Sequence, residues 1–178
     1  MRPNLLLICA VIGVTFVACG QPEVRKPVQK RSGGFMEGSV QRNKAMFAQE
    51  SIEIENFIKS QDSIDTYQQS EGGFWYSIQT NLPGNSTQPK KGDTVIFRYA
   101  VYDLAMNPIV SVLDNGTIEY QVDQSHQELI TGLREGIKLS TPKSELKLVL
   151  PSIMAYGYRG LPGTLAPNTP VLVEIYRD

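Results

Sequence analysis

The segment that most constrains the fold of this chain is a loop near its C-terminus, residues 155–170. It holds three Gly and three Pro in sixteen residues, which forbids a regular helix or a central strand. It also carries large apolar side chains at Tyr156, Tyr158, Leu161 and Leu165. A β-favouring run, residues 171–175, follows at once. Two interpretations fit: a flap that holds these side chains over a pocket, or a long connection whose apolar residues cap the core.

The first eighteen residues are typical of a bacterial secretion signal. Arg2 supplies the positive start, and residues 5–17 form an apolar stretch that is shorter than the roughly 20 residues of a membrane span. The sequence FVACG that ends this region is similar to a lipobox, which predicts that Cys19 becomes the first residue of the mature chain and carries lipid. The alternative is a secreted protein cut near Ala18 with a free thiol. Cys9 lies in the part that would be removed.

Composition excludes several classes of function. The net charge is −1, and the 17 Lys and Arg form no dense block, so a nucleic-acid partner is not expected. A single histidine, His126, argues against a metal site and is expected to be an exposed residue near a helix start. No nucleophile–base pair or Gly-rich phosphate loop is apparent, and no cofactor is expected.

The chain divides into four segments by composition: a signal peptide at 1–18, a lipidated tether at 19–40, an N-terminal helix at 41–70 and a globular domain at 71–178. Residues 41–66 lack Gly and Pro, which favours a helix in this part of the third segment. Its apolar stripe is narrow and consists of Phe47, Ile54, Phe57, Ile58 and Ile64. This stripe would either pack on the domain or pair with a second copy of the chain, so both a monomer and a dimer remain open.

The globular domain is predicted to be α+β, an antiparallel sheet curved around one short helix. Alternating apolar residues predict strands at 93–102, 118–122 and 146–150, and β-favouring apolar runs predict further strands at 74–78, 109–110 and 171–175. Ser125 and Glu128 have capping-box spacing, which predicts a helix that begins there and ends near Gly136. Gly132 inside that helix predicts that another element approaches closely.

The run AYGYRGLPGTLAPNTPVLVEI resembles the loop and final strand of FKBP-type peptidyl-prolyl cis-trans isomerases. The resemblance extends back through ELITGLREG at 128–136 to GDTV at 92–95 and Tyr99, and so covers residues 89–176. It implies an FKBP-like fold for the domain and an active site that rotates X-Pro bonds without a cofactor.

The resemblance also implies the site residues. The Tyr156 hydroxyl and the Ile130 backbone N–H would donate hydrogen bonds to the bound peptide. The proline pocket would be lined by Tyr99, Ile109, Tyr120, Leu129, Leu133, Leu165 and Val173. Leu133 stands where the family most often has Trp, and Val110 where it has a substrate-orienting Asp. Fewer aromatic walls imply a wider pocket and a weaker or more selective activity.

Three functional hypotheses follow from this resemblance. The first is a prolyl isomerase that assists the folding of proline-containing envelope proteins, held by its lipid in the outer membrane and facing the periplasm. The second is a non-catalytic module that binds proline-containing partners in the same groove. The third is a role in gliding motility, because the lipobox and the sequence GFWY at 73–76 look similar to those of lipid-anchored FKBP-type proteins that accompany such movement.

Overall fold

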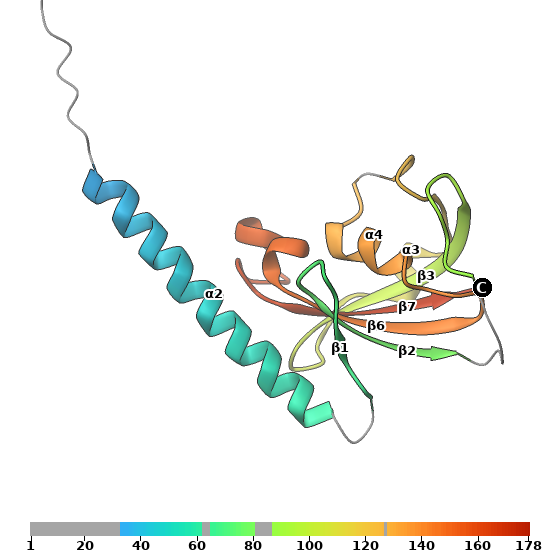
Figure 1. Cartoon of the computed structure of the whole chain (residues 1–178), viewed down its shortest axis with the longest axis horizontal. Helices are drawn as coiled ribbons and strands as arrows, with labels where there is room; N and C mark the ends of the chain where they lie inside the picture. Colours follow the sequence, from blue (N-terminus) through green and yellow to red (C-terminus); the bar gives the residue numbers. More distant parts are fainter. Residues whose placement is uncertain (1–32, 62–64, 81–86, 127) are drawn as a thin grey trace, which may run out of the picture. The chain divides into compact units, whose positions relative to one another are not determined.

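The computed structural model describes residues 33–61, 65–80, 87–126 and 128–178 (Figure 1). The predicted signal peptide, Cys19 and the first part of the predicted tether lie outside these residues, as does Ile64. Within the described part of the chain, no helix is long and apolar enough to cross a membrane. Residues 37–178 form one compact unit.

A seven-stranded antiparallel sheet forms the centre of the domain. Its strands run in the order β1 (Gln68–Gln69), β2 (Trp75–Thr80), β6 (Ser144–Leu150), β7 (Val171–Arg177), β3 (Thr94–Asp103) and β4 (Pro108–Val110). The remaining strand, β5 (Ile118–Gln121), pairs with the first half of β3. The six predicted strands are confirmed to within about two residues at each end, and the first half of β3 shows the period-two pattern of a half-buried strand.

Alternation along the strands gives the sheet two faces with different coverings. On the first face, Val101, Leu148 and Val173 belong to the main core, and α4 (Thr131–Ile137) packs against it (Figure 1). Adjacent residues in the strands, such as Val149 and Leu172, point to the second face and form a smaller apolar cluster. The α+β class predicted for the domain is therefore confirmed.

Helix α4 packs very closely on β6. A Cβ atom added to Gly132 or Gly136 would overlap the side chains of Leu150 or Leu148, respectively. Both leucines are fully buried. The close approach predicted from Gly132 is thus confirmed, and Gly136 makes the same approach one turn later.

The predicted start of α4 is wrong. The helix begins at Thr131, with Ile130 as its N-cap and no side-chain capping bond. Ser125 instead accepts a hydrogen bond at its Oγ from the Gln121 backbone N–H (2.9 Å). Residues 123 and 126 have positive φ angles, so the chain turns tightly here before it can enter the helix. The capping box occurs earlier, between Ser111 and Asp114 of a short helix that was not predicted, α3 (Val112–Asn115).

The N-terminal helix, α2 (Gly33–Gln61), begins before the predicted residue 41 and ends before the predicted residue 66. Ile54 and Phe57 from its second half are buried against Val149 and Leu172 on the second face of the sheet. The apolar stripe therefore packs on the domain, as in the first of the two alternatives. Phe47, which lies two helical turns before Ile54, is 44% exposed.

The connection after α2 is anchored by a buried carboxylate. Asp65 accepts hydrogen bonds from Gln79 Nε2 and Lys147 Nζ, both at 2.8 Å, and its side chain is 1% exposed. Lys147 and Gln79 lie on β6 and β2, so this cluster ties the chain that follows α2 to the sheet.

Candidate functional site

The nine residues predicted for the proline site come from six parts of the fold but belong to one apolar cluster. β3, β4, β5 and β7 contribute one each, the segment entering α4 and its first turn contribute three, and the loop after β6 contributes two. They are Tyr99, Ile109, Tyr120, Val173, Leu129, Ile130, Leu133, Tyr156 and Leu165. The structure thus brings together residues that lie up to 74 positions apart, from 99 to 173.

These nine residues divide into a floor and a surface. Tyr120, Leu133 and Val173 are fully buried, and Leu165 is 7% exposed. The Tyr120 hydroxyl accepts a hydrogen bond from the Asp123 backbone N–H (3.1 Å), so this hydroxyl stabilises the turn that follows β5. The other five are half-buried and pack against this floor. A bound peptide would meet those five first, and the floor residues shape the site from beneath.

The segment that enters α4 includes Ile130, whose backbone N–H is the donor that the resemblance implies. Ile130 is the N-cap of the helix, and its carbonyl accepts from the N–H groups of Leu133 (3.1 Å) and Arg134 (3.2 Å). The carbonyl is therefore engaged in the first turn of α4, which fixes the backbone of Ile130 at the start of the helix. Arg134 Nε also donates to the Leu129 carbonyl (3.2 Å), which holds the preceding residue in place.

Two tyrosines place their phenols in the site. Burial, and next the charge of the neighbouring Tyr99, raise the pKa of Tyr156 from 10.0 to about 12. Burial also raises the pKa of Tyr99. Both hydroxyls therefore stay protonated at neutral pH, and each can donate a hydrogen bond to a carbonyl.

The flap, residues 155–170, and the residues 151–154 that lead into it are held by hydrogen bonds within the loop. It contains two short 3-10 helices, η1 (Ser152–Met154) and η2 (Gly157–Arg159), with Tyr156 between them. Leu161 and Leu165 exchange backbone hydrogen bonds at 2.9 and 2.8 Å, and Asn168 N donates to the Gly157 carbonyl (2.8 Å). Gly160 has φ +58°, and a side chain there would overlap the backbone at 165–166. These contacts give the loop a fixed shape, which both interpretations of it require, and Leu161 and Leu165 pack on the main core.

Val110, which the resemblance places where the family has its orienting Asp, packs half-buried against the same cluster as the predicted site residues. The structure also reveals two contributors that the pattern of the sequence did not indicate. Asn115 at the end of α3 donates from Nδ2 to the Tyr99 carbonyl (3.4 Å), which ties the loop after β4 to β3. Glu50 on α2 is 7% exposed, and its carboxylate accepts from the backbone N–H and hydroxyl of Ser152 at the root of the flap. These contacts join distant segments, so local spacing holds no signal for them.

The site is suited to the rotation of an amide bond. It offers an apolar, half-buried surface with neutral donors. Among the described residues, no group of three or more His, Cys, Asp and Glu is placed to hold a metal ion. His126 is exposed and lies 2.7 Å from Glu128 Oε1.

Comparison with known proteins identifies the family. Residues 85–176, 52% of the chain, match the family described as FKBP-type peptidyl-prolyl cis-trans isomerase. The chain belongs to this family. FK506-binding protein 1 of Candida glabrata is 30% identical over 106 residues, which cover 59% of this chain and 90% of that protein. FK506-binding protein 1 of Saccharomyces cerevisiae is 30% identical over 94 residues, which cover 52% of this chain and 82% of that protein.

Solved structures share the fold of this FKBP-type protein. The crystal structure of FkpA from Escherichia coli has a TM-score of 0.57 and 18% sequence identity, covering 99% of this chain and 82% of that one. A peptidyl-prolyl cis-trans isomerase of Pseudomonas syringae has a TM-score of 0.55 and 21% identity, covering 73% of this chain and 91% of that one. The predicted FKBP-like fold and the assignment to peptidyl-prolyl isomerases are confirmed.

Proposed function

We propose that this FKBP-type isomerase is anchored in the bacterial envelope by a lipid on Cys19 and rotates X-Pro bonds in exported proteins. The half-buried apolar surface beside the Tyr156 hydroxyl and the Ile130 N–H carries the catalytic part of this proposal. The lipobox-like sequence around Cys19 supports the anchor, and the outer membrane facing the periplasm is the expected location. Its substrates would be proline-containing envelope proteins.

The chemistry needs no bond cleavage. The barrier to rotation about a peptide bond is about 18 to 20 kcal/mol, because resonance makes the C–N bond partly double. Twisting the X-Pro amide removes that resonance and its charge separation. A surface that excludes water from the amide therefore favours the twisted form over the planar one. Tyr156 and the Ile130 N–H would hold the peptide carbonyls so that the proline ring lies against the apolar floor.

A proline-limited assay tests this activity. Uncatalysed X-Pro isomerisation takes tens to hundreds of seconds, so even weak acceleration is measurable. We expect the protein to speed the isomerisation of several X-Pro peptides and of a refolding protein limited by a proline. If it accelerates neither, the catalytic role is lost and the binding role described next takes its place.

The second candidate is a module that binds proline-containing segments without catalysing their isomerisation. It is favoured by two positions: Leu133 fills the floor where the family most often has Trp, and Val110 stands in place of an orienting Asp. Such a module would bind an X-Pro peptide in an equilibrium titration yet leave its isomerisation rate unchanged. For either form we also propose a role in gliding motility, which deletion of the gene and scoring of surface movement would test.

The lipid anchor is tested separately. Metabolic labelling with a fatty acid analogue should mark the wild-type protein and place it in the membrane fraction. Cys19→Ser should lose the label and become soluble, because acyl chains supply the membrane affinity. A wild-type protein without label would contradict the anchor while leaving the isomerase assignment intact.

A further inference from the structure

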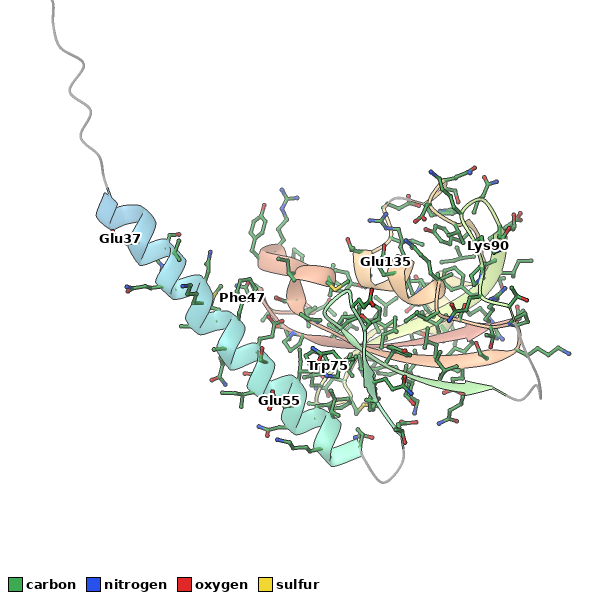
Figure 2. The ribbon with its side chains drawn as sticks, viewed as in Figure 1. Glu37, Phe47, Glu55, Trp75, Lys90 and Glu135 are labelled. Atoms are coloured by element: carbon green, nitrogen blue, oxygen red, sulfur yellow. The ribbon has the colours of Figure 1, made fainter. Side chains whose placement is uncertain are left out.

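Exposed apolar side chains gather in one groove between α2 and the flap. We name it the α2–flap groove and define it by Met46, Phe47, Ile153, Tyr156, Tyr158 and Arg159. Its volume is about 470 Å³, within the range of about 300 to 1,000 Å³ that is usual for ligand sites. Figure 2 shows Phe47 on the side of α2 toward the flap.

Four large apolar residues of this groove are exposed. Met46 and Phe47 on α2 are 41% and 44% exposed, and Ile153 just before the flap and Tyr158 on it are 69% and 73% exposed. Scattered apolar residues on a surface need no explanation, but a contiguous patch of them marks an interaction site.

The two walls of the groove are fixed to each other. The Glu50 carboxylate, one helical turn after Met46 and Phe47, binds the N–H and the hydroxyl of Ser152 at the flap root. A buried carboxylate is costly unless it is hydrogen-bonded, so this contact defines how α2 meets the flap. The Asn168–Gly157 hydrogen bond holds the other end of the flap. Hydrogen bonds therefore fix the shape of the groove.

The groove adjoins the candidate proline site at Tyr156. This residue packs against the cluster that forms the proline site, and it also lines the groove. A polypeptide whose proline occupies the site can thus continue into the groove. Arg159 is the charged member of the groove, and its guanidinium carbon lies 5.6 Å from the centre of the Tyr158 ring. The groove therefore suits an apolar segment that also carries a carboxylate.

We propose that the α2–flap groove is a second substrate-binding site, which holds an extended, apolar and acidic segment of the substrate polypeptide next to its proline. This inference rests on the proposed isomerase function, because it takes the groove's occupant from the substrate of that site. It adds a preference for unfolded chains over short peptides, since the residues that flank the X-Pro pair would make the contacts with the groove.

The test compares a short peptide with longer ones. The short probe is a tetrapeptide with a central X-Pro bond. Each long probe adds about six residues, which span about 20 Å when extended, on one side of the tetrapeptide. The added segments contain Leu, Phe and Glu, and matched segments contain Ser and Lys. We expect kcat/KM to be about threefold to tenfold higher for a Leu/Phe/Glu extension on one side than for the tetrapeptide, through a lower KM.

Variants of α2 and of the flap test whether contacts in the groove cause the higher kcat/KM of the extended peptide. Phe47→Gln should reduce the ratio of kcat/KM for the extended peptide over the tetrapeptide toward one. Ile52→Gln is the matched control, because Ile52 lies on the same helix, is 53% exposed and is not part of the groove. It should keep the wild-type ratio. Arg159→Gln should reduce the preference for Glu-containing extensions over otherwise identical Gln-containing ones.

Binding without turnover separates this proposal from the isomerase function. A fluorescent extended peptide with Ala in place of proline should bind the wild type and bind Phe47→Gln about threefold to tenfold more weakly. That result would support the groove even if no peptide were isomerised. Equal kcat/KM for short and extended peptides, or an equal loss in Ile52→Gln, would overturn it. So would a wild-type dimer in sedimentation that Phe47→Gln dissociates, because a second copy would then occupy the groove.

Discussion

At the scale of single residues, the Tyr156 hydroxyl is the group on which the proposed catalysis most depends. Tyr156→Phe removes one neutral hydrogen bond, of about 0.5 to 1.5 kcal/mol, and leaves the ring in place. We expect kcat/KM for an X-Pro peptide to fall about twofold to fifteenfold, since each 1.36 kcal/mol is tenfold. Tyr102→Phe is a suitable control, because Tyr102 packs with the cluster on the second face of the sheet. An unchanged rate in Tyr156→Phe would remove this hydroxyl from the mechanism.

The pKa of Tyr156 also sets the upper pH limit of the expected isomerase activity and of part of the stability. Because burial raises the pKa of Tyr156 to about 12, its hydroxyl stays a donor well above neutral pH. The isomerase rate should therefore be level from about pH 6 to about pH 10. The raised pKa means that the folded state holds this proton more tightly than the unfolded state. Its contribution to stability is thus complete below about pH 10 and is lost as the pH rises through about 12. Unfolding followed by circular dichroism should show this loss, and Tyr156→Phe should show less of it.

At the scale of secondary-structure elements, the contact of α4 with β6 holds the floor of the site in place. Gly136→Ala would improve helix propensity by about 1 kcal/mol but force a methyl group into the buried Leu148. Overpacking of a core costs about 1 to 3 kcal/mol, so we expect a net loss of up to about 2 kcal/mol in urea unfolding. A Cβ atom at Gly38 on α2 would meet only the end of the Arg42 side chain, at an ordinary contact distance of 3.7 Å, so Gly38→Ala should be neutral or stabilising. A more stable Gly136→Ala would show that α4 can move away from β6.

At the scale of the whole molecule, Glu50 joins the N-terminal helix to the flap. Glu50→Ala leaves the Ser152 N–H buried without its acceptor, which costs about 1 to 3 kcal/mol. We expect that loss in the free energy of unfolding. Glu50→Gln should lose less, because an amide oxygen can still accept. Glu55→Ala on the same helix is the matched control, since Glu55 is exposed and its ion pair is with exposed Lys59. Similar losses in Glu50→Ala and Glu55→Ala would mean that α2 is held by its apolar contacts alone.

The sequence by itself determined the strands, the flap and the types of residue in the site. Strands such as β3 could be predicted from the sequence because one side of the strand faces the core, so apolar residues recur at every second position, as in residues 95–101. The flap was readable because Gly and Pro act locally on φ and on the hydrogen-bonding backbone. The members of the site followed from the resemblance of residues 89–176 to a known family, and their shared cluster agrees with it.

Only the tertiary structure decided where α4 begins, which predicted site residues are buried, and where α2 packs. The Ser125–Glu128 spacing favoured a helix start, but the tight turns at residues 123 and 126 delayed that start to Thr131. Tyr120 and Tyr156 were both predicted to belong to the site, yet Tyr120 is fully buried and Tyr156 is half-buried. The Glu50–Ser152 contact joins residues 102 positions apart. Such contacts depend on how whole elements pack, and no pattern of neighbouring residues encodes that arrangement.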